Sequence, residues 1–230
     1  MKDLLCNSVF FGVFISILTY EMGSFLKRKW KLGILNPLLI SVAAVMILLT
    51  FLKVDYDAYY EGAKYLSYLL TPATVCLAVP LYEKIRLLRD NFKAIAGGVL
   101  SGVLTSLVTV LAFALLFGFS HEQYVTLLPK SITTAIGMGV SEELGGIVTI
   151  TVAVIIITGI LGNILAEAVL KLFRIEEPVA KGIAIGCSAH AIGTAKAMEM
   201  GDVEGAMSSL SIAVAGLLTV IGASVFGNFL

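Results

Sequence analysis

Residues 147–170 read IVTITVAVIIITGILGNILAEAVL, an apolar run with no charged residue before Glu167. The run is longer than the ~20 residues that an α-helix needs to cross the hydrocarbon core of a bilayer. Such a run is typical of a membrane-spanning helix.

The composition of the whole chain agrees with a membrane protein. Hydrophobic residues make up 58% of the 230 residues, charged residues make up 14%, and the mean hydropathy is +0.97. A soluble domain has about 45–50% hydrophobic and about 25% charged residues. A water-soluble globule of this size could not cover so many apolar side chains with polar ones. The lipid bilayer is therefore the expected surrounding. The 16 basic and 16 acidic residues cancel, which gives no electrostatic footprint for nucleic acid.

Five more apolar runs have the length of a spanning helix. The N-terminal run, Leu4–Leu26, has no basic segment before it and no small-residue cleavage site, so we expect a retained helix and not a signal peptide. The sequence thus predicts an all-α polytopic membrane protein with about six full spans. The other five runs are Leu4–Leu26, Leu32–Leu52, Gly62–Tyr82, Ala94–Phe119 and Ala206–Leu230.

Basic residues gather in three short connections, at residues 27–31, 84–93 and 171–181. The positive-inside rule places all three in the cytoplasm. This predicts a multi-pass protein of the cell (plasma) membrane with its N-terminus outside.

Two further stretches, Leu127–Gly146 and Gly182–Met200, are rich in Gly, Ser, Thr and Ala, and are too polar to face lipid. We expect them to be broken or re-entrant segments that line an interior cavity. Counted with the charge rule, the first enters from outside and the second from the cytoplasm, the layout of an inverted repeat. The alternative is that both cross fully, which gives eight spans. Either way we expect a single domain, with residues 1–61 as an N-terminal helix pair and 62–230 as the core.

The first polar stretch contains LLPKSITTAIGMG, residues 127–139. Proline suits the first turn of a helix, and the free N–H groups of such a turn attract anions. We therefore predict a half-helix starting near Pro129 that presents an anion site. In the alternative, the lysine reaches the interface and the hydroxyls bond their own backbone. The predicted site residues are Lys130, Ser131, Thr133 and Thr134.

The second polar stretch contains GCSAHAIGTAKAME, residues 186–199. An ionisable group at membrane depth marks an ion or substrate path by default, and imidazole changes charge near neutral pH. His190, with Ser188 and Thr194, is therefore predicted to bind a carboxylate or pass a proton. The alternative is a neutral His190 that bonds a backbone carbonyl between packed helices. Lys196 and Glu199 are expected to form an i, i+3 ion pair.

Prolines and glycines within these stretches are expected to act as hinges or close-packing points. Thr74, in the Pro-rich stretch at residues 71–80, is a further candidate for substrate binding. The predicted hinge and packing residues are Pro72, Pro80, Pro129, Gly137, Gly139, Gly186 and Gly193.

Enzymatic chemistry has no support in the sequence. Cys6, Cys76 and Cys187 lie far apart without C-x-x-C spacing. No H-E-x-x-H, G-x-S-x-G or Walker A pattern is present. We therefore expect no catalytic residue, no metal and no cofactor.

Four ordered motifs together resemble the LrgB/CidB family of bacterial membrane proteins. They are residues 71–82 (TPATVCLAVPLY), 128–137 (LPKSITTAIG), the glycine pair 145–146 and residues 188–195 (SAHAIGTA). The likeness covers essentially the whole chain and extends to the C-terminal half of the plastid glycolate/glycerate translocator. One departure is Thr71, where the family pattern leads us to expect Glu, so this position offers a hydroxyl and no carboxylate.

The resemblance implies two different roles. One is antiholin-like regulation of murein hydrolase export and autolysis, together with a small LrgA/CidA-like membrane protein. The other is carriage of a small carboxylate anion such as pyruvate, glycolate or glycerate, coupled to a proton or sodium ion. Lys130 and His190 in polar breaks at membrane depth favour the carrier. Homo-oligomerisation is a weaker expectation from the Gly98 to Gly102 spacing.

Overall fold

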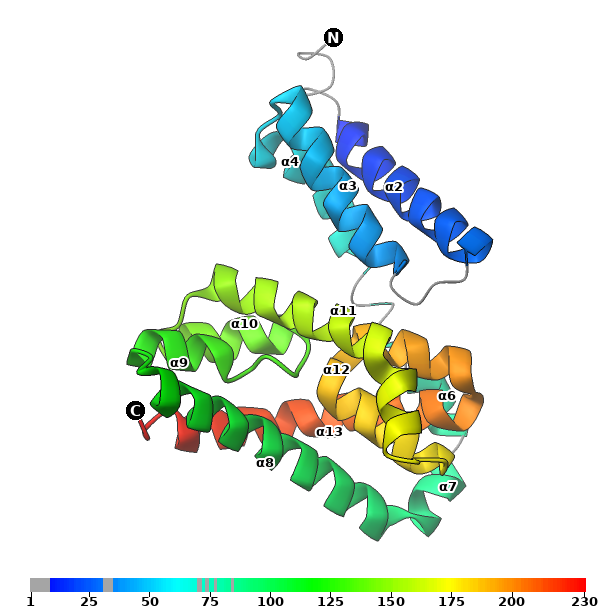
Figure 1. The fold of residues 1–230 in the computed structure, drawn as a ribbon, viewed down its shortest axis with the longest axis vertical. Coiled ribbons are helices and arrows are strands. Elements are labelled where there is room, and N and C mark those ends of the chain that lie inside the picture. Colours follow the sequence, from blue (N-terminus) through cyan, green and yellow to red (C-terminus); the bar gives the residue numbers. More distant parts are fainter. Residues whose placement is uncertain (1–8, 31–34, 70–71, 73–74, 77, 84) are drawn as a thin grey trace. The chain divides into compact units, whose positions relative to one another are not determined.

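The computed structural model describes residues 9–30, 35–69, 72, 75–76, 78–83 and 85–230. Every regular element within these ranges is a helix (Figure 1). Four described helices are long and apolar enough to cross a membrane, namely α2, α8, α11 and α13, and α3 is a shorter apolar helix. The chain is therefore an all-α polytopic membrane protein, as the composition predicts.

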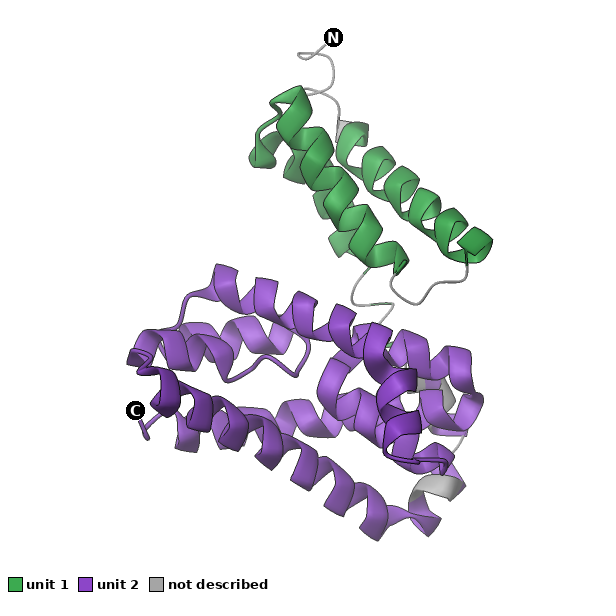
Figure 2. Ribbon diagram, viewed as in Figure 1, with its two compact units in different colours: residues 1–76 green, residues 77–230 purple. Residues whose placement is uncertain are grey.

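The chain divides into two compact units, residues 1–76 and 77–230 (Figure 2). The first unit contains α2 (Val9–Trp30), α3 (Pro37–Leu52) and α4 (Tyr56–Ser67). The α4 helix packs on α2, where the hydroxyls of Ser16 and Tyr59 lie 2.7 Å apart. Because of this packing, the first unit extends past the helix pair expected at residues 1–61.

The first unit is held by small and hydroxyl residues where its helices meet. The hydroxyls of Thr19 on α2 and Ser41 on α3 lie 2.9 Å apart. At the start of α3, the Asn36 side chain accepts a hydrogen bond from the backbone N–H of Leu38 at 2.9 Å. Asn36 is a favoured N-cap residue and Pro37 a favoured first residue, so this helix begins where its sequence directs.

The second unit contains three long helices, α8 (Phe92–Phe117), α11 (Val148–Leu172) and α13 (Asp202–Phe226), which match three predicted spans. In Figure 1, α8 lies beside α13, and the C-terminus lies near α9. The remaining helices of this unit are α6 (Ala78–Glu83), α7 (Ile85–Asp90), α9 (His121–Leu127), α10 (Thr134–Glu143) and α12 (Pro178–Met200).

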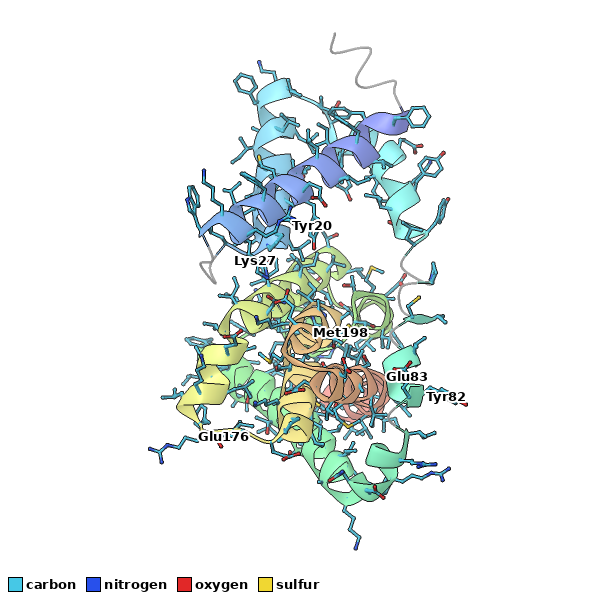
Figure 3. The ribbon with its side chains drawn as sticks, turned by 90° about the vertical axis from the view of Figure 1, so that its right-hand side faces the viewer. Tyr20, Lys27, Tyr82, Glu83, Glu176 and Met198 are labelled. Atoms are coloured by element: carbon cyan, nitrogen blue, oxygen red, sulfur yellow. The ribbon has the colours of Figure 1, made fainter. Side chains whose placement is uncertain are left out.

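The prediction of one continuous helix over Gly62–Tyr82 is wrong. The α4 helix ends at Ser67, and a separate helix, α6, begins at Ala78. The described end of α4 is a turn at Tyr68 and Leu69, where the Leu69 N–H donates to the Leu66 carbonyl oxygen at 3.1 Å. The α6 helix packs against α13 in the second unit, and Figure 3 shows its exposed Tyr82 side chain pointing outward.

The two ends of the second unit are distinguished by the helices that begin and end there, and both ends carry acidic residues. The α8 helix begins and α11 ends at one end, which we call the basic end because it carries Lys93, Lys171, Arg174 and Lys181. The α8 and α13 helices end at the opposite end, where the Tyr124 hydroxyl of α9 donates to the carbonyl oxygen of Phe226 at 2.9 Å. These two ends are the reference for the broken segments.

The first broken segment, which we call hairpin A, comprises residues 121–147 and returns to where it starts. The backbone N–H of Ile147, at its end, donates to the hydroxyl of Thr126, near its start, at 2.8 Å. Thr151 of α11 donates to the Thr126 carbonyl oxygen at 2.9 Å and lies 2.7 Å from the Ser141 hydroxyl. Hairpin A therefore leaves the opposite end and comes back to it.

The second broken segment, hairpin B, is α12 itself, residues 178–200. His190 has φ 41° and ψ −140°, which breaks the helix. Gly186 and Thr194 both contact Ser208 of α13, although residues eight apart in a straight helix lie about 12 Å apart. The chain therefore reverses at His190. Ile185 and Ala197, on the two arms, pack with Leu170 at the basic end.

The hairpins thus enter the second unit from opposite ends. This is the re-entrant arrangement that the polar stretches predict, in contrast to the eight-span alternative. The reason lies in the polar composition of both segments, because irregular backbone at membrane depth is tolerated where protein surrounds it. An inverted repeat relating the two halves of the chain remains a prediction.

Candidate functional site

A cavity of about 640 Å³ lies between α8, the first arm of hairpin B and the turn of hairpin A. Its volume falls within the ~300–1,000 Å³ range of small-molecule sites. Small and hydroxyl side chains dominate the walls. These include Gly98, Ser101, Gly102, Thr105, Ser106 and Thr109 of α8, Ala180, Ala184 and Ser188 of α12, and Lys130 and Ser131 of hairpin A.

Lys130 lines this cavity from the turn of hairpin A. Its Nζ donates to the Ser131 hydroxyl at 3.0 Å, and that hydroxyl lies 3.1 Å from the Ser106 hydroxyl. Ser106 sits near the middle of the 26-residue α8, so the lysine stands near half the depth of the unit. In the part of the chain that the structure describes, no carboxylate forms an ion pair with Lys130. A cation so placed can bind an anion.

The half-helix expected near Pro129 starts later than predicted, at Thr134. The backbone N–H of Lys130 bonds the Leu127 carbonyl oxygen at 3.2 Å, so residues 128–132 form turns that follow α9. Thr133 is the N-cap residue of α10 but makes no side-chain cap. Thr133 and Thr134 are half-buried and do not line the cavity. The lysine, and not the first turn of α10, therefore supplies the positive charge there.

Three hydroxyl residues of α8, Ser101, Thr105 and Thr109, line the cavity and were not predicted as site residues. We call them the α8 hydroxyl stripe. Their spacing of four places them on one face of the helix, and Leu100 and Leu104 are exposed beside them. The i, i+4, i+8 spacing was the available signal, but the high hydropathy of the run concealed it.

His190 does not line the cavity. It is 2% exposed, and its Nε2 lies 2.9 Å from the carbonyl oxygen of Ile155 on α11. A carbonyl oxygen only accepts, so Nε2 carries the proton. Gly159 gives the ring its space, because a methyl group there would lie 2.7 Å from the ring. The sequence hypothesis also places the anion between the Pro129–Thr134 segment and the His190 segment, but His190 does not line the cavity that Lys130 lines and takes the packed, carbonyl-bonded arrangement.

Hydrogen bonds also satisfy the backbone around the break in hairpin B. Thr194 donates its hydroxyl to the His190 carbonyl oxygen at 2.9 Å and lies 2.7 Å from the Ser208 hydroxyl. Asn163 of α11 donates to the carbonyl oxygen of Ile192 at 2.9 Å. Thr194 is thus a structural partner of the break and is not part of the cavity wall. A break in a spanning segment persists because its freed backbone groups find partners of this kind.

The other predicted substrate residues divide between the cavity and undescribed positions. Ser188 lines the cavity, and its hydroxyl donates to the Ala184 carbonyl oxygen at 2.7 Å. Thr74 and Thr71 lie outside the described residues. Pro72 is exposed, and Pro80 lies within α6, where only its backbone is described.

Most of the predicted packing positions lie at close helix contacts. A methyl group at Gly186 would lie 2.5 Å from the Ser208 carbonyl oxygen, and one at Gly193 would lie 2.9 Å from Ile185 Cγ2. At Gly137 it would collide with Ile155. Pro129 is fully buried in the turn of hairpin A. Gly139 is an exception, because nothing lies within 4 Å of the added methyl position there.

The Gly98 to Gly102 spacing serves a contact within the chain. A methyl group at Gly98 would lie 3.1 Å from Ile183, and one at Gly102 would lie 3.0 Å from Cys187, both on α12. These glycines therefore let α12 approach α8 and form a wall of the cavity. Because the two glycines serve this internal contact, their spacing gives no support for homo-oligomerisation. Homo-oligomerisation remains a prediction.

An ion-pair cluster fixes the second arm of hairpin B to α11. Lys196 Nζ lies 2.7 Å from Glu167 and 3.1 Å from Glu199, which confirms the predicted i, i+3 pair. Figure 3 labels Met198 of the same arm, which packs over Gly205 at the start of α13. Among the described residues, no group of three His, Cys, Asp or Glu side chains could hold a metal ion.

Comparison with known proteins agrees with the resemblance seen in the motifs. A sequence profile of the LrgB-like family matches residues 16–229. The chain is 37% identical to Holin-like protein CidB of Staphylococcus aureus, over 91% of each chain. It is 36% identical to Holin-like protein CidB of Staphylococcus epidermidis over the same shares. No solved structure matches the chain. The chain belongs to the LrgB-like family.

Proposed function

We propose that this chain is a holin-like membrane protein that regulates murein hydrolase export and autolysis, acting with a small LrgA/CidA-type partner. The observation that carries this proposal is the 37% identity, over 91% of both chains, to relatives named holin-like. Identity at this level across nearly the whole length supports a shared role. The helical, multi-pass architecture is compatible with it.

The regulatory function is tested in a bacterium from which the resident LrgB-like protein has been deleted. Expression of this chain should change extracellular murein hydrolase activity and the rate of induced lysis, with and without the small partner. The Lys130→Ala variant, expressed to the same level, is assayed in parallel to separate regulation from carriage of an anion. Unchanged hydrolase activity and lysis with the wild-type chain would contradict the proposal.

A second candidate function is carriage of a small monocarboxylate, coupled to a proton or sodium ion. The observation that favours it is the cavity at mid-depth, where Lys130 faces hydroxyl groups without a carboxylate partner among the described residues. A monocarboxylate leaving water needs several charge-assisted hydrogen bonds, each worth about 1.5–3 kcal/mol, to replace its hydration. Lys130, Ser131 and the α8 hydroxyl stripe can supply them.

The two functions are separated by flux in proteoliposomes. Labelled pyruvate, glycolate and glycerate are supplied with a proton or a sodium gradient, to the chain alone and to the chain with its small partner. Carriage requires flux that Lys130→Ala abolishes. Regulation of lysis without any flux, retained in Lys130→Ala, favours the holin-like role alone.

A further inference from the structure

The lining of the cavity between α8 and hairpin B begins at the basic end of the second unit and runs along α8 as far as Thr109. At the basic end its lining reaches Asn91, Ala94 and Glu177. On α8 the lining stops at Thr109, about two-thirds of the way along the 26-residue helix. The stretch from Ala94 to Thr109 spans about 22 Å at 1.5 Å per residue. The cavity therefore covers roughly half of a bilayer's thickness.

Beyond Thr109 no residue of α8 lines the cavity, and the buried residues of the helix there, Val110 and Ala114, are apolar. Leu107, Tyr124 and Leu128 are each at most 1% exposed and belong to one hydrophobic cluster with Val110 and Ala114. The same cluster continues along the buried face of α8 toward the basic end, through Val99 and Ile95. No lining residue of the cavity lies on α9 or α13.

We propose that this cavity is a one-ended aqueous vestibule, in which the α8 hydroxyl stripe (Ser101, Thr105, Thr109) leads small hydrophilic anions from the basic end to Lys130. The proposal rests on the carrier candidate described above. The stripe gives a solute successive hydroxyl partners about 6 Å apart, the pitch of four residues. At the mouth, Lys93 and Lys181 adjoin the lining residues Ala94 and Ala180 in sequence, while the charged residue of the lining itself is Glu177.

The vestibule is tested by thiol accessibility in the full-length chain. Cys6, Cys76 and Cys187 are replaced by Ala, and single cysteines are introduced as Ser101→Cys, Thr105→Cys and Thr109→Cys. A membrane-impermeant maleimide is added to intact cells or to inverted vesicles. A thiol reacts as the thiolate, which forms in water and not in hydrocarbon. Each variant must keep the thermal unfolding midpoint of the cysteine-free parent.

Three reference variants make the result readable. Lys93→Cys marks the basic end, and Gln123→Cys, at an exposed position on α9, marks the opposite end. Leu104→Cys is the matched control, because Leu104 is exposed on the same helix beside the stripe but does not line the cavity. The comparison does not depend on which face of the membrane is cytoplasmic.

We expect Ser101→Cys and Thr105→Cys to be labelled from the same side as Lys93→Cys, at least tenfold faster than Leu104→Cys. Labelling at the Leu104→Cys rate, or from the side that labels Gln123→Cys, overturns the vestibule. In a second arm, pyruvate is added during labelling of Thr109→Cys, at a position that lines the same cavity as Lys130. Slower labelling supports anion entry, whereas fast labelling unchanged by pyruvate supports the vestibule and counts against the carrier function.

Discussion

Hairpin A and hairpin B both interrupt the second unit with polar residues, but they use those residues differently. In hairpin B, the polar groups bond the protein itself: His190 bonds Ile155, Thr194 bonds Ser208, and Asn163 bonds Ile192. In hairpin A, Lys130 bonds one hydroxyl and faces a cavity. A polar residue at membrane depth can therefore stabilise a break in a helix or bind a solute. Its hydrogen-bond partners distinguish these two roles.

The largest expected effect comes from filling the contact that holds hairpin B against α13. In Gly186→Val, the added side chain meets the Ser208 backbone, which cannot move aside as a flexible side chain could. We expect a loss of about 3 kcal/mol, the upper part of the overpacking range, and a much reduced yield of folded protein. The measurement is thermal unfolding in detergent.

Gly139→Ala is the matched control for that variant. Gly139 lies within α10, and nothing lies within 4 Å of the added methyl group. We expect stability to be unchanged or higher by about 0.5–1 kcal/mol, because alanine favours helix over glycine. A Gly186→Val variant as stable as Gly139→Ala would mean that hairpin B is not closely packed on α13.

The second effect concerns hairpin A. Lys130→Ala removes the cation from the cavity, so we expect anion affinity to fall about 10- to 100-fold, the equivalent of one charge-assisted hydrogen bond. Stability should change little, since the lysine has one hydroxyl partner. The measurement is the shift in thermal unfolding midpoint on addition of pyruvate or glycolate, which binding to the folded state must raise. A wild-type shift that persists in the variant would remove Lys130 from the site.

The third effect is the reverse pattern in hairpin B. His190→Ala removes the hydrogen bond to Ile155, so we expect a loss of about 1 kcal/mol of stability and no change in the anion-dependent midpoint shift. The same two measurements as for Lys130→Ala decide it. A variant of unchanged stability that has lost anion binding would reverse the roles assigned to the two hairpins.

The smallest effect is expected at the ion-pair cluster. Glu199→Gln weakens one contact of Lys196, and Glu199 is half exposed. Partly exposed pairs contribute about 0–1 kcal/mol, and the contact of Lys196 to Glu167 remains. We expect a change within about 0.5 kcal/mol, measured by thermal unfolding at low and at high salt. A loss above 2 kcal/mol would show that the second arm of hairpin B depends on this cluster.

The site was predictable where a polar residue stands in a polar stretch. Lys130, Ser131 and Ser188 were identified in this way, and all three line the cavity. Ser101, Thr105 and Thr109 were not, because in a strongly apolar helix a few hydroxyls look like residues that bond their own backbone, as Ser101 does with Gly98. These hydroxyls line a cavity because α12 packs against α8 at Gly98 and Gly102. That packing is a long-range contact, which local sequence patterns do not predict.

The amino-acid sequence alone determined the helical membrane architecture, the positions of the long helices and the location of both breaks. These follow from local chemistry, since run length, proline, glycine and charge each act within a few residues. Only the tertiary structure decided that His190 turns toward α11 while Lys130 turns toward the cavity. Both residues carry the same local signal, an ionisable group in a Gly- and Ser-rich break. What separates them is the neighbouring surface, a carbonyl oxygen of Ile155 for one and the hydroxyls of Ser131 and Ser106 beside open space for the other.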